Sequence, residues 1–224
     1  MKIGRQLWVS AFAIGAMLML AAGALVASPK AQFAIRWDLH GQPYGYADAW
    51  LAVLLVPAVS VALTALFAFA PRLLPPNTLE RAVTPWLAVW TALLIAMCAA
   101  QAALVALNLG VAVNTPRLAT LIFAGVFAFL GNYMGKIRYN HVIGFRTPWT
   151  VADARVWDKT HRFLGRAMVV CTAFLVAATF LTPAGRSGDL WILSGIFLCA
   201  FAPFVAAFVY SLCISPRAQN GAAS

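Results

Sequence analysis

Six long stretches of this chain contain no charged residue, and this feature restricts the possible folds more than any other. They cover residues 6–28, 49–70, 82–116, 118–135, 167–185 and 190–216. An uncharged apolar stretch of about 20 residues is long enough to cross the hydrocarbon core of a membrane as a helix. The stretches lack the alternation of a membrane β-strand. They predict an all-α membrane protein with six transmembrane helices, with cores near 7–27, 50–70, 86–108, 118–134, 167–183 and 190–212.

The composition excludes a soluble globular protein and leaves no room for a separate soluble domain. Hydrophobic residues make up 63% of the chain and charged residues 10%, whereas a soluble domain is about 25% charged. The first stretch follows Lys2 and Arg5 and could be read as a cleaved signal peptide. Its apolar core of about 21 residues exceeds the usual 7–15, so we expect a retained span.

Lysine and arginine residues are distributed unequally between the two sides that six spans would create. One side holds Lys2, Arg5, Arg72, Arg81, Lys136, Arg138, Arg146, Arg155, Lys159, Arg162, Arg166 and Arg217, and the other holds Lys30, Arg36, Arg117 and Arg186. Because basic loops resist translocation, this bias places both termini in the cytoplasm of a bacterial inner-membrane protein. The net charge of +10 then sets topology and attracts anionic lipid headgroups, rather than nucleic acid.

The spans themselves offer little chemistry. All four cysteines lie in predicted spans without metal-ligand or C-x-x-C spacing, so no disulfide, metal or cofactor is expected. Only Gln101, Asn108 and a few hydroxyl groups are polar at depth, whereas ion-coupled carriers hold ionisable residues within their spans.

The segment between the first two spans, 28–48, is the only sizeable loop expected on the outer side. Its aromatic residues predict a belt at the membrane interface. Alternatively, Trp37, His40 and Tyr44 form a ligand-facing surface on which Asp38 and Asp48 attract a cationic peptide.

Residues 131–166 carry seven of the 16 basic residues and contain a pattern of residue types at uneven spacing. The pattern consists of Asn132, Gly135, Lys136, Ile137, Arg138, Asn140, Ile143, Gly144, Arg146, Thr147, Pro148, Trp149, Thr150, Trp157, Thr160, His161 and Arg162. It resembles the signature of the SdpI family of bacterial membrane proteins. Residues 40–43 also resemble a short extracytoplasmic module that often precedes this signature, although Tyr44 stands where an acidic residue is usual.

This resemblance implies a role in immunity against a secreted peptide toxin, or in membrane-based signalling. The protein that gives the family its name protects its producer, and it also holds a cytoplasmic repressor at the membrane. The implied partners are a peptide toxin outside and a repressor inside. We accordingly expect an N-terminal three-helix half (1–114), an SdpI-like half (115–216) and a short tail (217–224).

Ten residues of the signature segment are the candidate binding residues. They are Asn132, Lys136, Arg138, Asn140, Arg146, Thr147, Trp149, Trp157, His161 and Arg162. Each could instead be a structural anchor, because polar loop residues commonly cap helices and form turns. Arg146 precedes a Thr-Pro-Trp-Thr turn, and its guanidinium suits bidentate binding of phosphate or carboxylate.

An amphipathic cytoplasmic helix is expected between the fourth and fifth spans, running on into the fifth span. Thr150 and Asp153 resemble a capping box that would open it near Val151. A basic stripe would hold Arg155, Lys159, Arg162 and Arg166, and an opposite apolar stripe Trp157, His161, Leu164 and Met168. Such a helix lies along the inner membrane surface with its rings in the membrane.

Two other classes of function remain open. A lipid-headgroup carrier would have a lipid-sized cavity between spans four and five, lined by Asn132, Arg138 and Arg146. A membrane enzyme acting on a headgroup would use His161 with Asp158, although no nucleophile or paired carboxylate accompanies them. The residues favour an interfacial histidine over a catalytic one.

Overall fold

Six long helices dominate the computed structural model, which describes residues 2–38, 42–73, 82–140, 142–183 and 185–215. They are α1 (Lys2–Ala27), α2 (Ala49–Phe69), α3 (Val83–Asn108), α4 (Thr115–Met134), α6 (Ala154–Leu181) and α7 (Arg186–Cys213). The shorter elements are β1 (Gln32–Trp37), β2 (Pro43–Asp48), the 3-10 turn η1 (Ala70–Leu73) and α5 (Pro148–Ala152). All six long helices are long and apolar enough to cross a membrane, so the prediction of an all-α, multi-pass membrane protein is confirmed.

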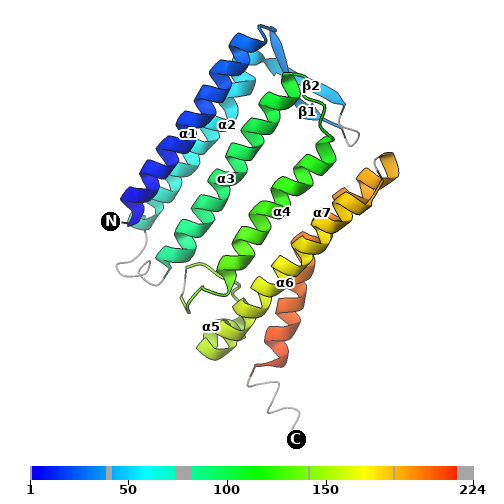
Figure 1. Ribbon diagram of the computed structural model, residues 1–224. Coiled ribbons are helices and arrows are strands. Elements are labelled where there is room, and N and C mark those ends of the chain that lie inside the picture. Colours follow the sequence, from blue (N-terminus) through cyan, green and yellow to red (C-terminus); the bar gives the residue numbers. More distant parts are fainter. Residues whose placement is uncertain (1, 39–41, 74–81, 141, 184, 216–224) are drawn as a thin grey trace, which may run out of the picture.

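The long helices run side by side and alternate in direction (Figure 1). Helices α1, α2 and α3 lie on one side of the molecule, and α4, α6 and α7 on the other. Strands β1 and β2 lie at one end, which we call the hairpin end. The other end, which we call the signature end, carries η1, α5, the beginning of α1 and the end of α7 (Figure 1). The two ends are therefore the two faces of the membrane protein.

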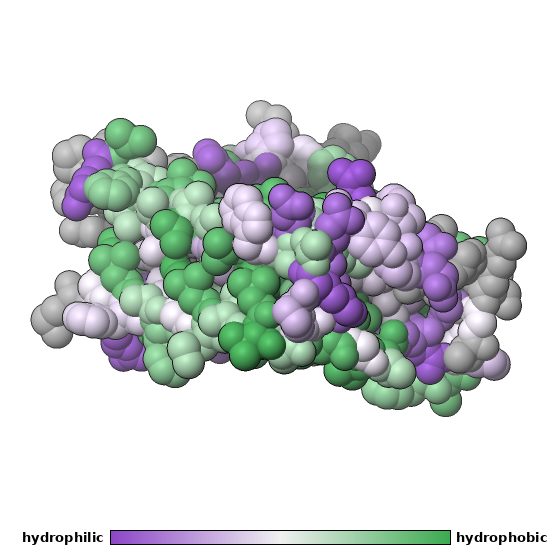
Figure 2. Space-filling model, turned by 90° about the horizontal axis from the view of Figure 1, so that it is seen from above, coloured by the Kyte–Doolittle hydropathy of each residue, from purple (hydrophilic) through white to green (hydrophobic). Residues whose placement is uncertain are grey.

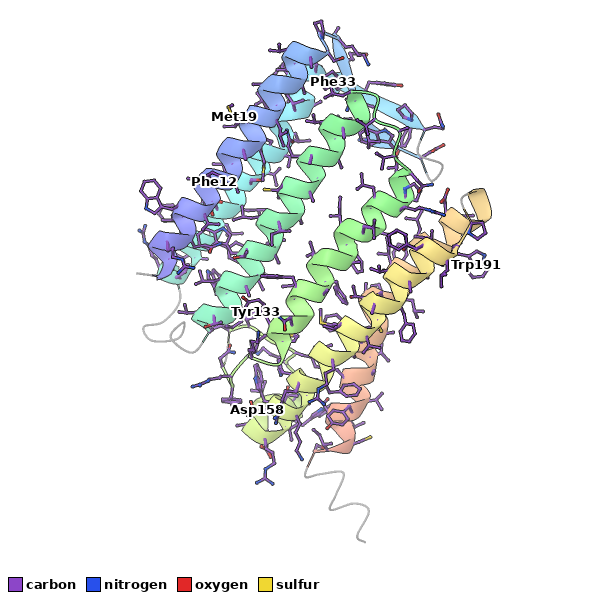
Figure 3. All side chains as sticks on the ribbon, viewed as in Figure 1. Phe12, Met19, Phe33, Tyr133, Asp158 and Trp191 are labelled. Carbon is purple, nitrogen blue, oxygen red and sulfur yellow. The ribbon has the colours of Figure 1, made fainter. Side chains whose placement is uncertain are left out.

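Large apolar side chains cover the outside of the bundle. Phe12, Met19 and Trp191 point away from the helices (Figure 3) and are 81%, 76% and 74% exposed. Viewed from the hairpin end, hydrophilic residues gather towards the middle and hydrophobic residues line the flank (Figure 2). A surface of this kind is stable when hydrocarbon, rather than water, surrounds the helices.

The antiparallel hairpin β1–β2 was not predicted from the sequence. Its register pairs Gln32 with Asp48 and Ala34 with Tyr46. Phe33 is completely buried in a cluster with small residues of α1 and α2. The side chain of Asn108, at the end of α3, accepts a hydrogen bond from the Ala34 amide (2.8 Å) and donates one to its carbonyl (3.0 Å). Asn108 thereby continues the strand pairing and fastens the hairpin to the bundle.

Small residues allow the helices of the first half to approach closely. The core shared by α1, α2 and α3 contains Ala21, Ala24, Ala52, Val53 and Val105. Small side chains let backbones approach in membranes, where packing contacts replace the hydrophobic driving force. The completely buried Gln101 donates a hydrogen bond to the Val53 carbonyl (3.0 Å). This residue, noted in the sequence as polar at depth, thus ties α3 to α2.

Two glycines make α4 and α6 cross closely in the second half. A Cβ atom on Gly165 would lie 2.6 Å from the Gly131 carbonyl oxygen, and one on Gly131 would lie 2.9 Å from the Cβ of Met168. Phe127, Leu164, Met168 and Leu175 pack next to this crossing, together with residues of α7. The crossing fixes α6 against α4 directly beside the segment that carries the family signature.

The amphipathic helix was expected to run from about Val151 into the fifth span, and its place in the cytoplasm is not confirmed. Residues 154–166 form the first half of α6, which continues through the predicted fifth span. The charged residues do not end this helix because all four basic members of the stripe lie on one exposed face. The division at residue 114 stays a prediction, and the tail from Arg217 lies outside the described residues.

Candidate functional site

The loop between α4 and α6 is a folded unit held by buried polar and aromatic side chains. Trp157, His161 and Thr150 are completely buried, and Asn140 and Thr147 are 4% and 6% exposed. A loop can be buried only if its backbone groups find partners inside the protein. The side chains of the signature supply those partners.

Asn140 organises the turn that leaves α4. Its amide nitrogen donates to the carbonyls of Arg138 (2.8 Å) and Ile143 (3.0 Å). Its oxygen accepts from the amides of Val142 (2.8 Å) and Ile143 (2.9 Å). Asn140 therefore satisfies four backbone groups at once, which makes it a structural residue of the loop.

Thr147 and Thr150 open the short helix α5 as a capping box. The Thr147 hydroxyl accepts from the Thr150 amide (3.2 Å), and the Thr150 hydroxyl accepts from the Thr147 amide (2.7 Å). Pro148 occupies the first turn. The predicted capping box of Thr150 and Asp153 is therefore wrong. Thr150 is the third residue of α5, because Pro148 takes the first helical position, which proline favours. Asp153 instead caps α6 by accepting from the Arg155 amide (2.6 Å).

Trp149 connects α5 to the last helix. Its indole nitrogen donates to the Ser211 hydroxyl (2.6 Å), and its ring meets Phe208 edge-on at 5.5 Å between centroids. Because Ser211 is 62 residues further along the chain, this bond ties the signature loop to α7. The loop is thereby held by three helices, α4, α6 and α7.

Trp157 and His161 form the centre of the loop, on the buried face of α6. Their rings stack with centroids 4.1 Å apart. The Trp157 indole donates to the Ile137 carbonyl (3.0 Å), and the Phe145 amide donates to His161 Nε2 (2.9 Å). Gly144 has a φ of +150°, and a Cβ there would lie 2.5 Å from Trp157 Cη2. Only glycine lets the loop pass over both rings.

The same contacts argue against the enzymatic use of His161. Nε2 accepts from the Phe145 amide, so Nδ1, which is 2.9 Å from the Trp157 carbonyl, carries the proton and donates. Neither nitrogen is left for Asp158, which lies on α6 near the signature end (Figure 3). Among the described residues, no group of three His, Cys, Asp or Glu side chains could hold a metal.

The expected stripes of α6 are present, but they face different surroundings from those predicted. Arg155, Lys159, Arg162 and Arg166 are exposed, whereas Trp157, His161, Leu164 and Met168 are buried. The apolar stripe packs against α4 and the signature loop. The prediction that its rings enter the membrane is wrong, because the folded loop covers Trp157 and His161 completely.

Five of the ten candidate binding residues are exposed at the signature end. They are Asn132, Lys136, Arg138, Arg146 and Arg162. The Lys136 ammonium lies 5.0 Å from the centre of the Tyr133 ring. The other five, Asn140, Thr147, Trp149, Trp157 and His161, are at least partly buried and build the framework. Binding by the exposed residues stays a prediction.

At the hairpin end, the candidate residues are only partly described. Tyr44 is 65% exposed on β2, and Trp37 is half-buried on β1. His40 lies outside the described residues. Tyr46 and Trp50 add further exposed rings, at 55% and 58%. These rings are compatible with both an interfacial belt and a ligand-facing surface.

A family model described as the SdpI/YfhL protein family matches residues 136–216. The matched segment contains the whole buried framework described above, and it leaves out only Asn132 and Gly135 of the expected signature. Through this segment the chain is similar to the SdpI/YfhL family. "Immunity protein SdpI" of Bacillus subtilis (strain 168) is 35% identical over 91 residues, which are 40% of this chain and 44% of that protein. The alignment thus spans less than half of this SdpI relative, and no solved structure matches the chain.

Sequence reasoning missed a polar cluster at the hairpin end of the SdpI-like half. Arg117 donates to the Thr182 carbonyl (2.6 Å), and Asn114 donates to the carboxylate of Asp189 (3.2 Å), which is 6% exposed. Asn114 also caps α4 by accepting from the Arg117 amide. The cluster joins α4, α6 and α7. The capping pattern Asn-Thr-Pro was a visible signal for the start of α4, but its long-range partners were not.

Proposed function

We propose that this protein gives its cell immunity against a membrane-active peptide toxin. The observation that carries the proposal is the 35% identity to Immunity protein SdpI, in a chain with six membrane-spanning helices. The family match covers α5, α6 and α7. In that part of the chain, the buried contacts of Trp157, His161 and Trp149 hold the helices and the loop as one unit.

In this proposal the protein lies in the bacterial inner membrane with its signature end in the cytoplasm. The bias of twelve basic residues against four supports this orientation. The described parts of the segments predicted to be cytoplasmic share the signature end of the bundle (Figure 1), which supports the same orientation. The hairpin end then faces the outside, where a secreted toxin arrives.

The hairpin end offers contact area to such a toxin. Tyr44, Tyr46 and Trp50 expose more than half of their surface, and Asp48 is exposed beside them. Aromatic rings supply much of the binding energy in protein interfaces, and a carboxylate attracts a cationic peptide. These features support a toxin-facing role for the hairpin.

The signature end offers a site for a cytoplasmic partner, such as a repressor held at the membrane. Arg138 and Arg146 are exposed on a loop whose backbone is fixed by Asn140 and the Thr147–Thr150 box. An arginine on a rigid loop loses little freedom when it pairs with a carboxylate or phosphate. We therefore assign Arg146 to partner binding and the buried residues to its support.

A protection assay tests the proposal. The chain is expressed in Bacillus subtilis lacking its own relative, and the cells are exposed to the toxin which that relative neutralises. We expect the unaltered chain to restore growth. Arg146→Ala and Arg146→Lys should both impair signalling, because lysine lacks the planar guanidinium that binds with two hydrogen bonds. Membrane abundance is measured for each variant.

Growth no better than with an empty vector, at normal membrane abundance, would argue against immunity to this class of toxin. If Arg146→Lys signals like the unaltered chain while Arg146→Ala does not, charge alone suffices and bidentate recognition is wrong.

A further inference from the structure

A groove of about 320 Å³ opens on the surface between α4 and α6, at the signature end. It is not the lipid-sized cavity that a carrier would need, and Arg138 and Arg146 do not line it. Asn132 of α4 lies on one side, and Arg162 and Arg166 of α6 lie on the other. All three side chains are exposed.

Glycines make the floor of this groove. Gly131 and Gly165 bring the helix backbones together, and Gly135 follows one turn later, at the C-cap of α4. A Cβ on Gly135 would stand 3.5 Å from Arg162 Cγ, in ordinary contact. All three glycines line the groove beside Arg162 and Arg166, and none of them places a side chain in it.

The two arginines are placed to bind one anion together. They are separated by four residues on α6, so their side chains leave the same face one turn apart. Arg162 Nε donates to the Asp158 carbonyl (3.2 Å), which orients its guanidinium. Two planar guanidinium groups and the amide of Asn132 match the several acceptor oxygens of a phosphate.

The length of α6 places the groove at the edge of the hydrocarbon core. Its 28 residues extend about 42 Å, whereas the core is roughly 30 Å thick. About eight residues therefore project beyond the core, and they do so at the signature end, where Arg155, Asp158 and Lys159 lie. Arg162 follows at the edge of the core, and Arg166 lies about 6 Å deeper, from where a long arginine side chain reaches the headgroups.

The membrane side of the groove is apolar. Val169 and Val170 line it and are 41% and 52% exposed. An anion with an attached hydrocarbon chain fits this sequence of surfaces, with the charge at the arginines and the chain along the valines. A free phosphate ion would gain nothing from the two valines.

We propose that this groove binds the phosphate of an anionic phospholipid, through Arg162, Arg166 and Asn132, with an acyl chain along Val169 and Val170. The site is distinct from the surface of Arg138 and Arg146, and it does not depend on whether the protein confers immunity. If the groove binds no lipid, the result expected in the protection assay stays the same. If the protection assay fails, the lipid proposal stays the same.

Native mass spectrometry of the full chain in detergent, with added phosphatidylglycerol or phosphatidylcholine, tests the site. We expect one phosphatidylglycerol molecule to bind more tightly than phosphatidylcholine. The variant Arg162→Gln/Arg166→Gln should weaken that binding by roughly tenfold or more, because each basic residue near the surface contributes. The matched control Arg155→Gln/Lys159→Gln removes the same charge from the same helix face. It should weaken binding by less than about twofold, because neither Arg155 nor Lys159 lines the groove.

Equal losses in the two double variants would overturn the proposal and indicate diffuse attraction of lipid to the basic stripe. An unchanged affinity in Arg162→Gln/Arg166→Gln, at an unchanged melting temperature, would also overturn it. Displacement of the lipid by millimolar inorganic phosphate would identify a soluble anion site and reject the lipid. Both pairs of residues are exposed, and thermal melting checks that each variant is folded.

Discussion

His161 uses both of its ring nitrogens inside the protein. One accepts from the Phe145 amide and the other faces the Trp157 carbonyl, while the ring stacks on Trp157. A buried amide that loses its acceptor costs about 1–3 kcal/mol. At the scale of the single residue, the histidine of the signature is therefore a structural residue that connects the loop to α6.

We predict that His161→Phe keeps the stacked ring but lowers the free energy of unfolding by about 1–3 kcal/mol, because the Phe145 amide loses its acceptor. Thermal melting of the purified protein in detergent measures the change. Protection in cells should persist at temperatures where the variant is folded. Full stability with abolished protection would instead point to a chemical role for the imidazole.

The sequence identified the residues of the site but not which of them are buried or which partners they bind. Asn132 and Asn140 are the same residue type eight positions apart, yet the first is exposed and the second holds a buried turn. The two asparagines differ in burial because the rest of the fold covers Asn140 and leaves Asn132 uncovered. The partner of Trp149, Ser211, lies in another helix, and local spacing carries no information about such a partner.

At the scale of the element, the crossing of α4 and α6 depends on the absence of two side chains. The Gly131 carbonyl occupies the space that a Cβ on Gly165 would need. Backbone atoms cannot rotate away as a side chain can, so the helices would have to separate. A Cβ on Gly125, also in α4, would meet nothing within 4 Å, so not every glycine of this helix has that role.

We predict that Gly165→Ala destabilises the protein by more than about 2 kcal/mol through overpacking. Gly125→Ala is the matched control, and it should be neutral or slightly stabilising, because alanine favours helices by up to about 1 kcal/mol. Melting temperatures of both purified variants are compared with that of the unaltered protein. Equal melting temperatures for the two variants would contradict the close crossing.

The helices were largely predictable, but the separate short helix α5 (Pro148–Ala152) was not. A helix from about Val151 into the fifth span was expected, and α6 starts at Ala154. Its basic residues share one face and leave the opposite face free to pack. The hairpin was missed for another reason: its pairing partner on the bundle is the Asn108 side chain, 74 residues from Ala34.

At the scale of the whole molecule, the alternating helices separate the hairpin end from the signature end. Placing the signature end in the cytoplasm predicts opposite accessibilities for Tyr44 and Lys159, which are both exposed on the protein. The prediction is tested with single cysteines at these positions, in a chain whose native cysteines, including the exposed Cys213, are replaced by alanine or serine.

An impermeant thiol reagent should label Tyr44→Cys in intact cells, and it should label Lys159→Cys only after the cells are permeabilised. The distribution of basic residues is the physical reason. The opposite pattern would reverse the orientation and with it the assignment of the hairpin to the toxin.

Helix α6 has a mechanical consequence for such a protein. It contains no proline, in contrast to α7 with Pro203. At the hairpin end Arg117 donates to the carbonyl of Thr182, the C-cap of this helix, and at the signature end Trp157 and His161 are hydrogen-bonded to the loop. A helix without a kink transmits a rotation along its axis instead of absorbing it at a bend. A turn imposed at the hairpin end would swing the four cations of its exposed face through the same angle, about 24–40 Å away.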